Sequence, residues 1–506
     1  MTNPLFDGLL ATGRTTPDKC FAILSDGREF TYADVEAVSA RFANALVALG
    51  VEPGDRVAVQ ADKSIEALML YLGTVRAGGV FLPLNTAYTP TEIDYFLNDA
   101  KPRVFVCDPA KRDGLAATAE GAGARLETLG ARATDAGSLN AQADAASGEF
   151  ATVARQPSDL AAILYTSGTT GRSKGAMLTQ DNLLSNAEVL RDYWRFTADD
   201  VLLHLLPIFH THGLFVASNT AMIAGGTMIF LPKFDVEQVF KYLPQATAMM
   251  GVPTFYTRLL ADERLNRERT AHMRLFTSGS APLLAETHRA FEERTGQRIL
   301  ERYGMTETNM STSNPYDGER RAGTVGFPLP GVELRIVDAD TAKPLPDGEI
   351  GVIEVKGPNV FCGYWQMPEK TAAEFRADGF FITGDLGLID PQGYVTIVGR
   401  GKDLIISGGF NIYPKEVEMA LDELPGVVES AVIGVPHPDF GEGVVGVVVA
   451  ERALEEGELT GALAERLARF KQPKRIVFVD ELPRNTMGKV QKNILRDRFA
   501  DLLGDK

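Results

Sequence analysis

Cysteine is scarce in this chain of 506 residues. It occurs three times, at Cys20, Cys107 and Cys362, and these positions lie far apart. Neither the close spacing of zinc ligands nor the dense pattern of a disulfide-stabilised secreted domain is present. We therefore expect three buried thiols in a reducing compartment and no disulfide framework.

Positive charge is also in deficit. Lys and Arg together number 51 against 67 Asp and Glu, which gives a formal net charge of −16. Proteins that bind nucleic acids or anionic membranes do so largely by neutralising phosphates with Lys and Arg. The charge balance therefore argues against a nucleic-acid or membrane partner, and any anionic ligand must be bound by a local group of cations.

An uninterrupted apolar run long enough to cross a membrane is absent as well. The longest apolar stretch, "LFVASNTAMIAGGTMIFLP" at 214–232, contains Ser218, Asn219 and the pair Gly225-Gly226. A membrane span needs about 20 mostly apolar residues in succession, so we predict a helix, a turn and a strand here. The first ten residues, "MTNPLFDGLL", lack the basic and apolar segments of a signal peptide. We expect a cytoplasmic protein.

The chain does contain a regular alternation of short β-type runs and helical patterns over about its first 320 residues. "DRVAVQ" precedes "SIEALMLYLGTVRAG", for example, and "MRLFTSG" precedes "LAETHRAFEERTG". Such alternation indicates βα units with mainly parallel sheets. Later runs such as "VELRIVD" and "GYVTIVGR", separated by Gly, Pro and Asp turns, indicate antiparallel strands in a barrel or curled sheet.

A cluster of glycines at 399–418, just before a helix that starts with proline, predicts a domain boundary. We expect an α/β protein with a large N-terminal domain (1–399) of parallel βα sheets plus a β-barrel-like part. A small α+β domain (400–506) would follow. Within it, 466–498 holds ten Lys or Arg against three acids. This bias is typical either of a solvated face or of a cationic rim for a polyphosphate.

The stretch "LYTSGTTGRSKGAM" (164–177) follows an apolar run and combines three glycines with hydroxyl side chains and two cations. A strand, a glycine-rich loop and a lysine usually present backbone N–H groups and one positive charge to phosphate oxygens. The pattern differs from the Walker loop, because Arg172 and Ser173 separate Gly171 from Lys174. We therefore predict phosphate binding by a different kind of loop.

Five segments in order closely resemble the motifs of the acyl-adenylate-forming superfamily, which includes acyl-CoA synthetases, luciferases and peptide-synthetase adenylation domains. They are "YTSGTTGRSKG", "YGMTETN" (303–309), "TGD" (383–385), "GRGKDLIISGG" and "PRNTMGKVQK" (483–492). The resemblance spans nearly the whole chain. It implies that ATP and Mg²⁺ activate a carboxylic acid as an acyl-adenylate, and that the acyl group then passes to a thiol such as coenzyme A. Within the superfamily, "PIFHTHGLF", "GVPTFYTRLL" and "RYGMTETNMSTSNPYDGERR" look most like malonyl-CoA synthetases.

The resemblance implies a nucleotide site. ATP brings about four negative charges to an anionic nucleophile, so catalysis must depend on positioning and charge neutralisation. The implied cradle for the β- and γ-phosphates comprises Thr166, Ser167, Gly168, Thr169, Thr170 and Lys174. The implied contacts to adenosine are Ser278, Gly279, Ser280, Ala281 and Pro282 on one side of the adenine, Tyr303 with Gly304 and Met305 on the other, and Asp385 and Arg400 at the ribose. Taken alone, Asp385 would be a turn residue and "YGMTE" a strand end.

Three residues carry the chemistry in this assignment. Glu307 offers a hard oxygen ligand for Mg²⁺, and Thr306 bonds the α-phosphate. Lys489 bridges the substrate carboxylate and the α-phosphate. Acetylation would remove the charge of Lys489, so a protein lysine acetyltransferase and a deacetylase are candidate partners.

In relatives the small domain is mobile. One pose presents the lysine that corresponds to Lys489 for adenylation, and the other builds the tunnel for the thiol. Lys402, in "GRGKD", falls at the hinge position of the family. Gly408 and Gly409 would then line the pantetheine path, where side chains would obstruct it.

The expected acyl pocket contains His210, His212, Ser280 and Arg258. The family places "FHTHG" against the acyl group, although such histidines are as often core or capping residues. Arg258 lies in "PTFYTRLL", a short amphipathic helix, where we expect it to be buried and to point toward an anion. A second carboxylate of the substrate would bind it in a bidentate pair; an internal salt bridge is the alternative.

We interpret the sequence as a ligase that joins a short dicarboxylate to coenzyme A, with malonate first and methylmalonate second, releasing pyrophosphate and then AMP. One alternative is a ligase for a short monocarboxylate or an aromatic acid, or an enzyme that loads a carrier-protein thiol. Another is a nucleotide sensor without catalysis. The presence of both Lys489 and Glu307 argues against the sensor, since a sensor could lose them without penalty.

Overall fold

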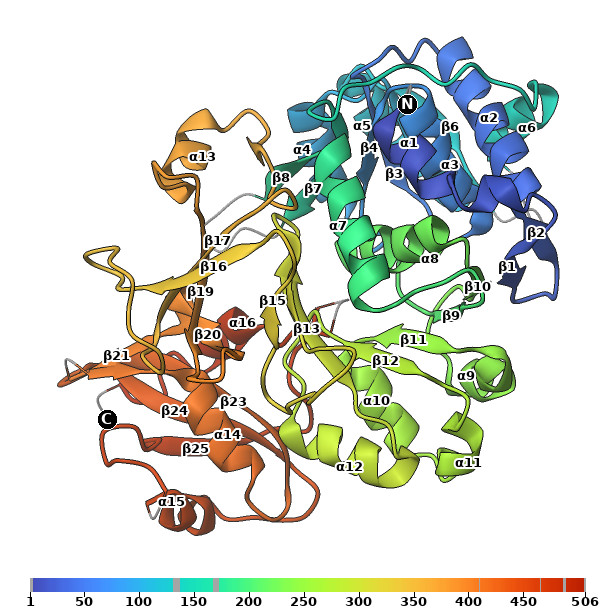
Figure 1. The fold of residues 1–506 in the computed structure, drawn as a ribbon. Helices are drawn as coiled ribbons and strands as arrows, with labels where there is room; N and C mark the ends of the chain where they lie inside the picture. Colours follow the sequence, from blue (N-terminus) through green and yellow to red (C-terminus); the bar gives the residue numbers. More distant parts are fainter. Residues whose placement is uncertain are drawn as a thin grey trace.

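The computed structural model describes residues 3–130, 137–166, 173–408, 410–464, 466–485 and 488–504. Two large, mainly parallel sheets come first along the chain, an antiparallel sheet follows, and a smaller α+β part begins after residue 400 (Figure 1). The mixed α/β class with a large parallel-sheet part and a smaller C-terminal part is therefore confirmed.

The first large sheet has seven strands in the order β18-β8-β7-β4-β3-β5-β6. Strands β3 to β7 run parallel, whereas β8 and β18 are antiparallel to their neighbours. The strands are β3 (Arg56–Gln60), β4 (Val80–Pro83), β5 (Val104–Cys107), β6 (Arg125–Thr128), β7 (Leu160–Thr166), β8 (Lys174–Thr179) and β18 (Gly363–Tyr364). The connecting helices are α2 (Tyr32–Ala48), α3 (Ile65–Arg76), α4 (Pro90–Ala100), η2 (Pro109–Lys111), α5 (Arg112–Gly121) and α6 (Gly137–Ala145).

The second large sheet has nine strands in the order β15-β14-β13-β12-β11-β9-β10-β1-β2, and its central six strands are parallel. The strands are β1 (Cys20–Leu24), β2 (Glu29–Thr31), β9 (Val201–His204), β10 (Thr227–Phe230), β11 (Ala248–Gly251), β12 (Leu275–Ser278), β13 (Leu300–Met305), β14 (Asn309–Ser313) and β15 (Phe327–Pro328). The helices are α1 (Pro4–Leu10), η1 (Gly13–Thr15), α7 (Gln180–Tyr193), η3 (His212–Ser218), α8 (Asn219–Ala224), α9 (Val236–Tyr242), η4 (Leu243–Gln245), α10 (Pro253–Leu260), α11 (Arg267–Thr270) and α12 (Ala285–Thr295).

The helix, turn and strand predicted for 214–232 are present. Helix α8 ends at Gly225, whose φ of 71° is the left-handed conformation that glycine adopts without strain. Strand β10 follows directly, and η3 before α8 is a π-helix. Among the described residues, no helix is long and apolar enough to cross a membrane.

The predicted barrel-like part is an antiparallel sheet of four strands, β16 (Glu333–Val337), β17 (Gly351–Lys356), β19 (Phe381–Ile389) and β20 (Val395–Arg400). Within the described residues its edge strands β16 and β20 do not pair, so the sheet is open. Helix α13 (Pro368–Glu374) precedes β19. Its end is anchored because Phe375 packs against Phe361 and Phe381, with ring centroids 5.6 and 5.3 Å apart.

The part that follows residue 400 has its own sheet and its own two apolar clusters. A long hairpin of β23 and β24 forms its centre, and β25 pairs parallel to β24. The elements are η5 (Gly401–Asp403), β21 (Ile405–Ser407), β22 (Phe410–Ile412), α14 (Pro414–Asp422), β23 (Val427–His437), β24 (Gly441–Ala450), α15 (Glu456–Ala464), β25 (Arg475–Phe478) and α16 (Lys492–Arg498).

The expectation of three buried cysteines is wrong for two of them. Cys107 is buried in β5, but Cys20 is half-buried and Cys362 is exposed. Cys362 lies in the segment that enters the two-residue edge strand β18, and such an edge leaves one side of the chain open to solvent. All three are free thiols.

Candidate active site

The carboxyl ends of the parallel strands in the nine-stranded sheet gather the central motifs. Strands β9, β11, β12 and β13 pair in parallel register, so their carboxyl ends lie at one edge. This edge is where α/β proteins usually bind ligands. "SGSAP" follows β12, "YGMTE" completes β13, and "FHTHG" follows β9 by a short loop. The sequence separates these motifs by tens of residues, and the sheet brings them together.

Lys174 begins β8, and Thr166 ends β7 beside it. The other members of the predicted phosphate cradle, Ser167, Gly168, Thr169 and Thr170, lie outside the described residues. Lys174 Nζ is 3.1 Å from Glu374 Oε1 and lies 4.1 Å from the centroid of the Tyr364 ring. The Lys174 ammonium group therefore contacts β18 and α13, which both come about 200 residues later in the chain.

Glu307 and Thr306 occupy the tight turn between β13 and β14. The Glu307 side chain is buried, and burial raises the pKa of its carboxyl group. Its oxygen Oε1 is 3.1 Å from the hydroxyl of Tyr364. A buried carboxylate without a salt bridge fits a divalent cation, because Mg²⁺ is commonly held by one or two carboxylates together with phosphates of a substrate. Among the described residues no group of three or more His, Cys, Asp or Glu could hold a metal on its own.

Buried asparagines form hydrogen bonds with the backbone of the same turn and of the start of β14. Asn359 donates from Nδ2 to the carbonyl oxygens of Thr308 and Met310, at 2.6 and 3.2 Å. Asn186 donates to the carbonyl of Met310 at 2.9 Å and accepts its N–H at 3.2 Å. These bonds leave the turn little freedom, so the direction of Glu307 is set by the fold.

Tyr303, Asp385 and Arg400 form one connected group. The Tyr303 hydroxyl donates to Asp385 Oδ2 at 2.5 Å, and Arg400 Nε is 2.7 Å from Asp385 Oδ1. Asp385 and Arg400 are register partners on β19 and β20. The negative charge of Asp385 raises the pKa of Arg400, and burial raises that of Tyr303. Asp385 is thus oriented by two neighbours and is more than a turn residue.

Lys489 projects from a small loop toward these groups. Its backbone N–H donates to Asn485 Oδ1 at 3.0 Å, and its carbonyl accepts the N–H of Asn485 at 2.9 Å. Burial lowers the pKa of the Lys489 ammonium group; Arg400 and Arg302 lower it further, while Asp385 raises it. The side chain nevertheless keeps exposed surface. A cation that is surrounded by protein groups and still reached by water lies in a recess of the surface.

Of the two histidines of "FHTHG", His210 lies just before η3 and His212 begins it, and burial lowers the pKa of both. His210 Nδ1 accepts the backbone N–H of His212 at 3.2 Å, and His212 Nδ1 is 3.1 Å from the hydroxyl of Ser280. Burial, with help from Lys489 and Arg302, lowers the pKa of His210 to about 3. Ser280 has a φ of 69°, which is rare and costly for a non-glycine residue and is found mainly at functional sites.

Arg302 is the residue that the sequence analysis missed. It follows Glu301 in β13 and is 3% exposed. Among the described residues it has no salt bridge, and its Nε and Nη2 have no hydrogen-bond partner there. Burial lowers its pKa to about 9. Its guanidinium fills the space beside Gly279, where an added Cβ would lie 2.0 Å from Nη1. The available signal was a charged residue inside the apolar strand run "ILERYGM", paired with a glycine in "SGSAP".

Unpaired buried polar atoms cluster around Arg302. His212 Nε2, Thr211 Oγ1 and Ser278 Oγ are buried and find no hydrogen-bond partner among the residues that the structure describes. Buried polar groups almost always have partners. A polar ligand at this place would supply them.

Arg258 does not lie where the sequence analysis expected it. It is exposed on α10, and its guanidinium carbon is 6.0 Å from the ring centroid of Phe234. The prediction that it is buried is wrong, because α10 turns Tyr256 and Leu259 into the core and leaves Arg258 on the opposite face. Whether it contacts the substrate from that face stays a prediction.

The remaining predicted residues lie in two groups. Ala281 and Pro282 continue the loop after Ser280, and Gly304 and Met305 end β13; an added Cβ at Gly304 would lie 1.8 Å from the carbonyl oxygen of Asn309. In the smaller part, Lys402 lies within η5, and Gly408 has a φ of 57° close to the ring of Phe440. Gly409 lies outside the described residues.

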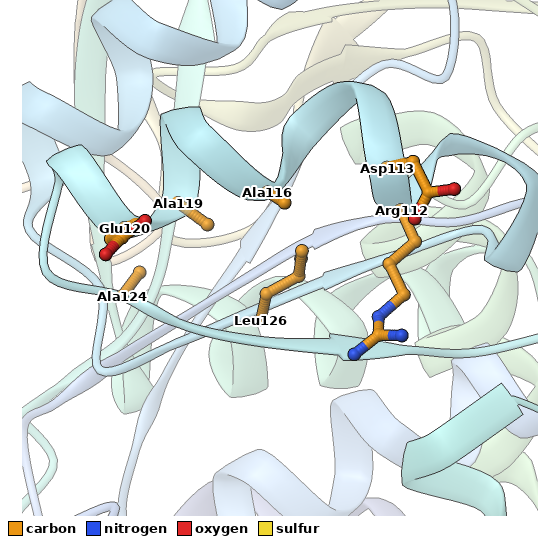
Figure 2. Close-up of a pocket in the computed structure, with 7 residues that line it drawn as sticks. All are labelled: Arg112, Asp113, Ala116, Ala119, Glu120, Ala124 and Leu126. Carbon is orange, nitrogen blue, oxygen red and sulfur yellow. The ribbon is translucent and has the colours of Figure 1, made fainter.

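A separate surface hollow lies between α5 and β6 (Figure 2). Its lining combines three charged with four aliphatic side chains: Arg112, Asp113, Glu120, Ala116, Ala119, Ala124 and Leu126. Strand β6 is the edge strand of the seven-stranded sheet opposite to β8 and β18, which border the candidate site. We assign no chemistry to this hollow.

The geometry defines a class of site: a lysine-bearing loop, a buried carboxylate and a recess of buried polar atoms lie at the carboxyl ends of parallel strands, where α/β enzymes bind their ligands. The model of the AMP-binding enzyme family matches residues 10–365, and that of the AMP-binding enzyme C-terminal domain matches residues 416–489. The chain belongs to this family. It is an ATP-dependent acyl-CoA ligase that works through an acyl-adenylate, so the alternative of a nucleotide sensor is set aside.

Among the solved structures similar to this chain are those of MatB from Rhodopseudomonas palustris. MatB is 61% identical over 99% of this chain and 100% of that chain. The TM-score is 0.97 for the ATP-bound structure and 0.86 for the apo structure. The arrangement of this chain is therefore closer to the ATP-bound one.

Two curated relatives cover nearly the whole chain. The malonate–CoA ligase of Arabidopsis thaliana is 33% identical over 94% of this chain and 85% of its own length. The sulfoacetate–CoA ligase of Cupriavidus necator is 37% identical over 94% of both proteins.

Proposed function

We propose that this enzyme joins malonate to coenzyme A, with methylmalonate as a second substrate, and gives malonyl-CoA, AMP and pyrophosphate. The observation that carries the proposal is Arg302, a buried guanidinium for which the described part of the chain offers no carboxylate partner. Leaving a charge buried and unpaired is costly. A second carboxylate on the acid would pair with Arg302 in a bidentate hydrogen bond, whereas a monocarboxylate would leave it unpaired.

The two curated relatives support a substrate with two acidic groups. Malonate carries a second carboxylate on its two-carbon unit, and sulfoacetate carries a sulfonate at the same position. Both are small dianions that a buried guanidinium can recognise. His212 and Ser280 contact each other beside Arg302. They would form hydrogen bonds with those oxygen atoms of the distal acidic group that Arg302 does not bind.

For the adenylation step we assign the following roles. Lys489 bridges the reacting carboxylate and the α-phosphate, where negative charge gathers as the bond forms, and Thr306 bonds the α-phosphate. Lys174 and the glycine-rich loop bind the β- and γ-phosphates. Asp385 keeps free lone pairs for the ribose hydroxyls beside Arg400. Glu307 would hold Mg²⁺, which neutralises charge on the phosphates.

For the adenine we assign the backbone of Ser278 to Pro282 on one side and Tyr303, with Gly304 and Met305, on the other. Because the Tyr303 hydroxyl is bonded to Asp385, its ring is held in one orientation. A fixed ring can pack against the base without a further loss of side-chain entropy.

Coenzyme A would approach from the smaller part of the chain, with pantetheine passing Gly408 and Gly409. An exposed pair of rings, Phe410 and Phe470, stacks there at 4.6 Å, and Lys471 lies 5.7 Å from the Phe470 ring. Aromatic faces with nearby cations suit a nucleotide that carries phosphates. Six of the ten cations in 466–498 form salt bridges with acidic side chains, so the choice between a cationic rim and a solvated face stays open. A carrier-protein thiol is the alternative acceptor, and saturation of turnover by free coenzyme A would exclude it.

The experiment compares malonate, sulfoacetate and propionate in the wild type and in Arg302→Leu, with pyrophosphate release as the readout. We expect kcat/KM for malonate to fall about 100-fold or more, because the distal carboxylate loses its charged partner. Propionate should be spared or improved, and KM for ATP should stay the same. A parallel fall for malonate and propionate would contradict the assignment.

Arg258→Leu is the matched control, since it removes an exposed arginine from α10. Exposed charges contribute little, so malonate should lose much less than with Arg302→Leu. If Arg258→Leu caused the larger selective loss, the distal carboxylate would bind at α10 and the role of Arg302 would be wrong.

A further inference from the structure

One carboxylate outside the assigned machinery contacts Lys174 directly and reaches Glu307 through the hydroxyl of Tyr364. Glu374, the last residue of α13, lies 200 positions along the chain from Lys174, and the two form a salt bridge of 3.1 Å. Both side chains are mostly buried, at 17% and 20% exposure. Lys370 Nζ lies 2.8 Å from the same oxygen of Glu374. The carboxylate therefore has two cations on one oxygen.

The other oxygen of Glu374 faces Tyr364. The Tyr364 hydroxyl is 2.7 Å from Glu374 Oε2 and 3.1 Å from Glu307 Oε1, so its single proton can be donated to either carboxylate. Burial alone would raise the pKa of Glu374, but hydrogen bonds from Lys370, Tyr364 and Lys174 outweigh it and lower that pKa. Glu374 is thus a carboxylate held ionised beside Lys174.

The position of Glu374 is fixed by its neighbours along the chain. Phe375 packs into the ring cluster of Phe361 and Phe381, and the backbone N–H of Tyr364 donates to the hydroxyl of Thr371 at 2.9 Å. The backbone that carries the Glu374 carboxylate is therefore held in place by packing. When a triphosphate binds, the Lys174 ammonium group then has to leave the carboxylate to contact the phosphates.

We propose that Glu374 is a built-in competitor for Lys174: it holds the lysine when the nucleotide is absent, yields it to the β- and γ-phosphates of ATP, and takes it back as pyrophosphate leaves. The proposal rests on the proposed phosphate-binding role of Lys174. Pyrophosphate forms when the substrate carboxylate oxygen bonds to the α-phosphorus of ATP and the α–β bridging P–O bond breaks. It then carries the two phosphates that contact Lys174, whereas the AMP portion carries neither. Lys370 stays on Glu374 and balances its charge while Lys174 is away.

The test is the Glu374→Gln variant, with equilibrium binding of Mg²⁺-ATP, pyrophosphate and AMP as readouts. We expect ATP and pyrophosphate to bind about threefold to tenfold more tightly, since the freed lysine no longer gives up an ion pair. AMP affinity should not change. In turnover, pyrophosphate should become a stronger product inhibitor by the same factor.

Glu369→Gln is the matched control. Glu369 is an exposed acid in the first turn of the same helix, so its loss changes the net charge equally. It should leave all three affinities unchanged. Equal tightening in both variants would mean that general electrostatics act and would overturn the proposal.

The remaining outcomes are also decisive. Weaker binding of ATP and pyrophosphate in Glu374→Gln would show that Glu374 orients Lys174 for the phosphates and does not compete for it. Unchanged binding in Glu374→Gln would also overturn the proposal. The Lys174→Gln variant then shows whether the phosphate-binding role of Lys174 is itself wrong. If Lys174→Gln also leaves ATP binding unchanged, Lys174 does not bind the phosphates. None of these measurements needs the acid substrate, so they stand apart from the test of malonate.

Discussion

Lys489 lies near two arginines and two carboxylates, and this neighbourhood decides how it titrates. Burial and the nearby Arg400 and Arg302 lower its pKa below that of an ordinary lysine, against the opposing effect of Asp385 and Glu307. The bridging role proposed for Lys489 needs the ammonium form. Activity in adenylation should therefore be lost as pH rises through the lowered pKa, at a lower pH than an ordinary lysine would allow.

Lys489→Ala should reduce the adenylation step about 100-fold or more, because a charge aimed at the transition state is removed. Thioester formation from preformed malonyl-AMP should continue, since that step has no carboxylate to bridge. The two half-reactions are measured separately, as pyrophosphate release and as thioester formation. Equal losses in both would contradict a role confined to the first step. Acetylated Lys489 should behave like the alanine variant, which gives the proposed acetyltransferase and deacetylase a measurable effect.

The π-helix η3 is the element that shapes the acyl recess. The Gly213 carbonyl accepts the Ser218 hydroxyl at 2.9 Å and lies 2.9 Å from His204 Nε2. Lys63 Nζ is 2.8 Å from His204 Nδ1, so Lys63 donates there and His204 Nε2 carries the proton given to Gly213. π-helical turns occur often at functional sites. Here the turn places His212 at the recess.

Gly213→Ala should disturb this element. An added Cβ would lie 2.0 Å from the carbonyl oxygen of Pro207, which is backbone and cannot yield easily. We expect the free energy of unfolding to fall by about 1 to 3 kcal/mol. The KM for the acid should rise more than the KM for ATP. Gly114→Ala in α5 is the control, because nothing lies within 4 Å of its added Cβ. A Gly213 variant with wild-type melting temperature and kinetics would contradict the account.

At the scale of the whole molecule, we predict that the position of the smaller part decides which half-reaction is served. Lys489 lies at the recess, and the arrangement is closer to the ATP-bound than to the apo structure of MatB. This is the pose that adenylation would need if Lys489 has the proposed bridging role. Thioester formation should need a different pose, and the segment that allows the change is predicted at Lys402 in η5, between β20 and β21.

Lys402→Pro should separate the half-reactions. Proline restricts its own φ and the conformation of Gly401, so rotation between the two parts should be hindered. We expect one half-reaction to continue while the other, and overall turnover, fall sharply. Lys402→Ala is the control, because it removes the side chain and keeps the backbone free. Unchanged turnover in Lys402→Pro would place the pivot elsewhere.

The βα alternation, the antiparallel later sheet and the turn in 214–232 could all be predicted, because each depends on local spacing of apolar residues and turn formers. The helical part of that stretch could be predicted, but not that it starts as a π-helix. That detail depends on His204 and Lys63, which come from β9 and from the loop after β3.

The sequence by itself determined the order of elements and the motifs whose chemistry is local, such as the glycine-rich loop before Lys174 and the turn that carries Glu307. The tertiary structure alone decided which arginine is buried. Arg258 and Arg302 both lie among apolar residues in the sequence, yet Arg258 is exposed on α10 and Arg302 is buried beside Gly279. The reason is physical: burial depends on which elements pack against a side chain, and those elements come from distant parts of the chain.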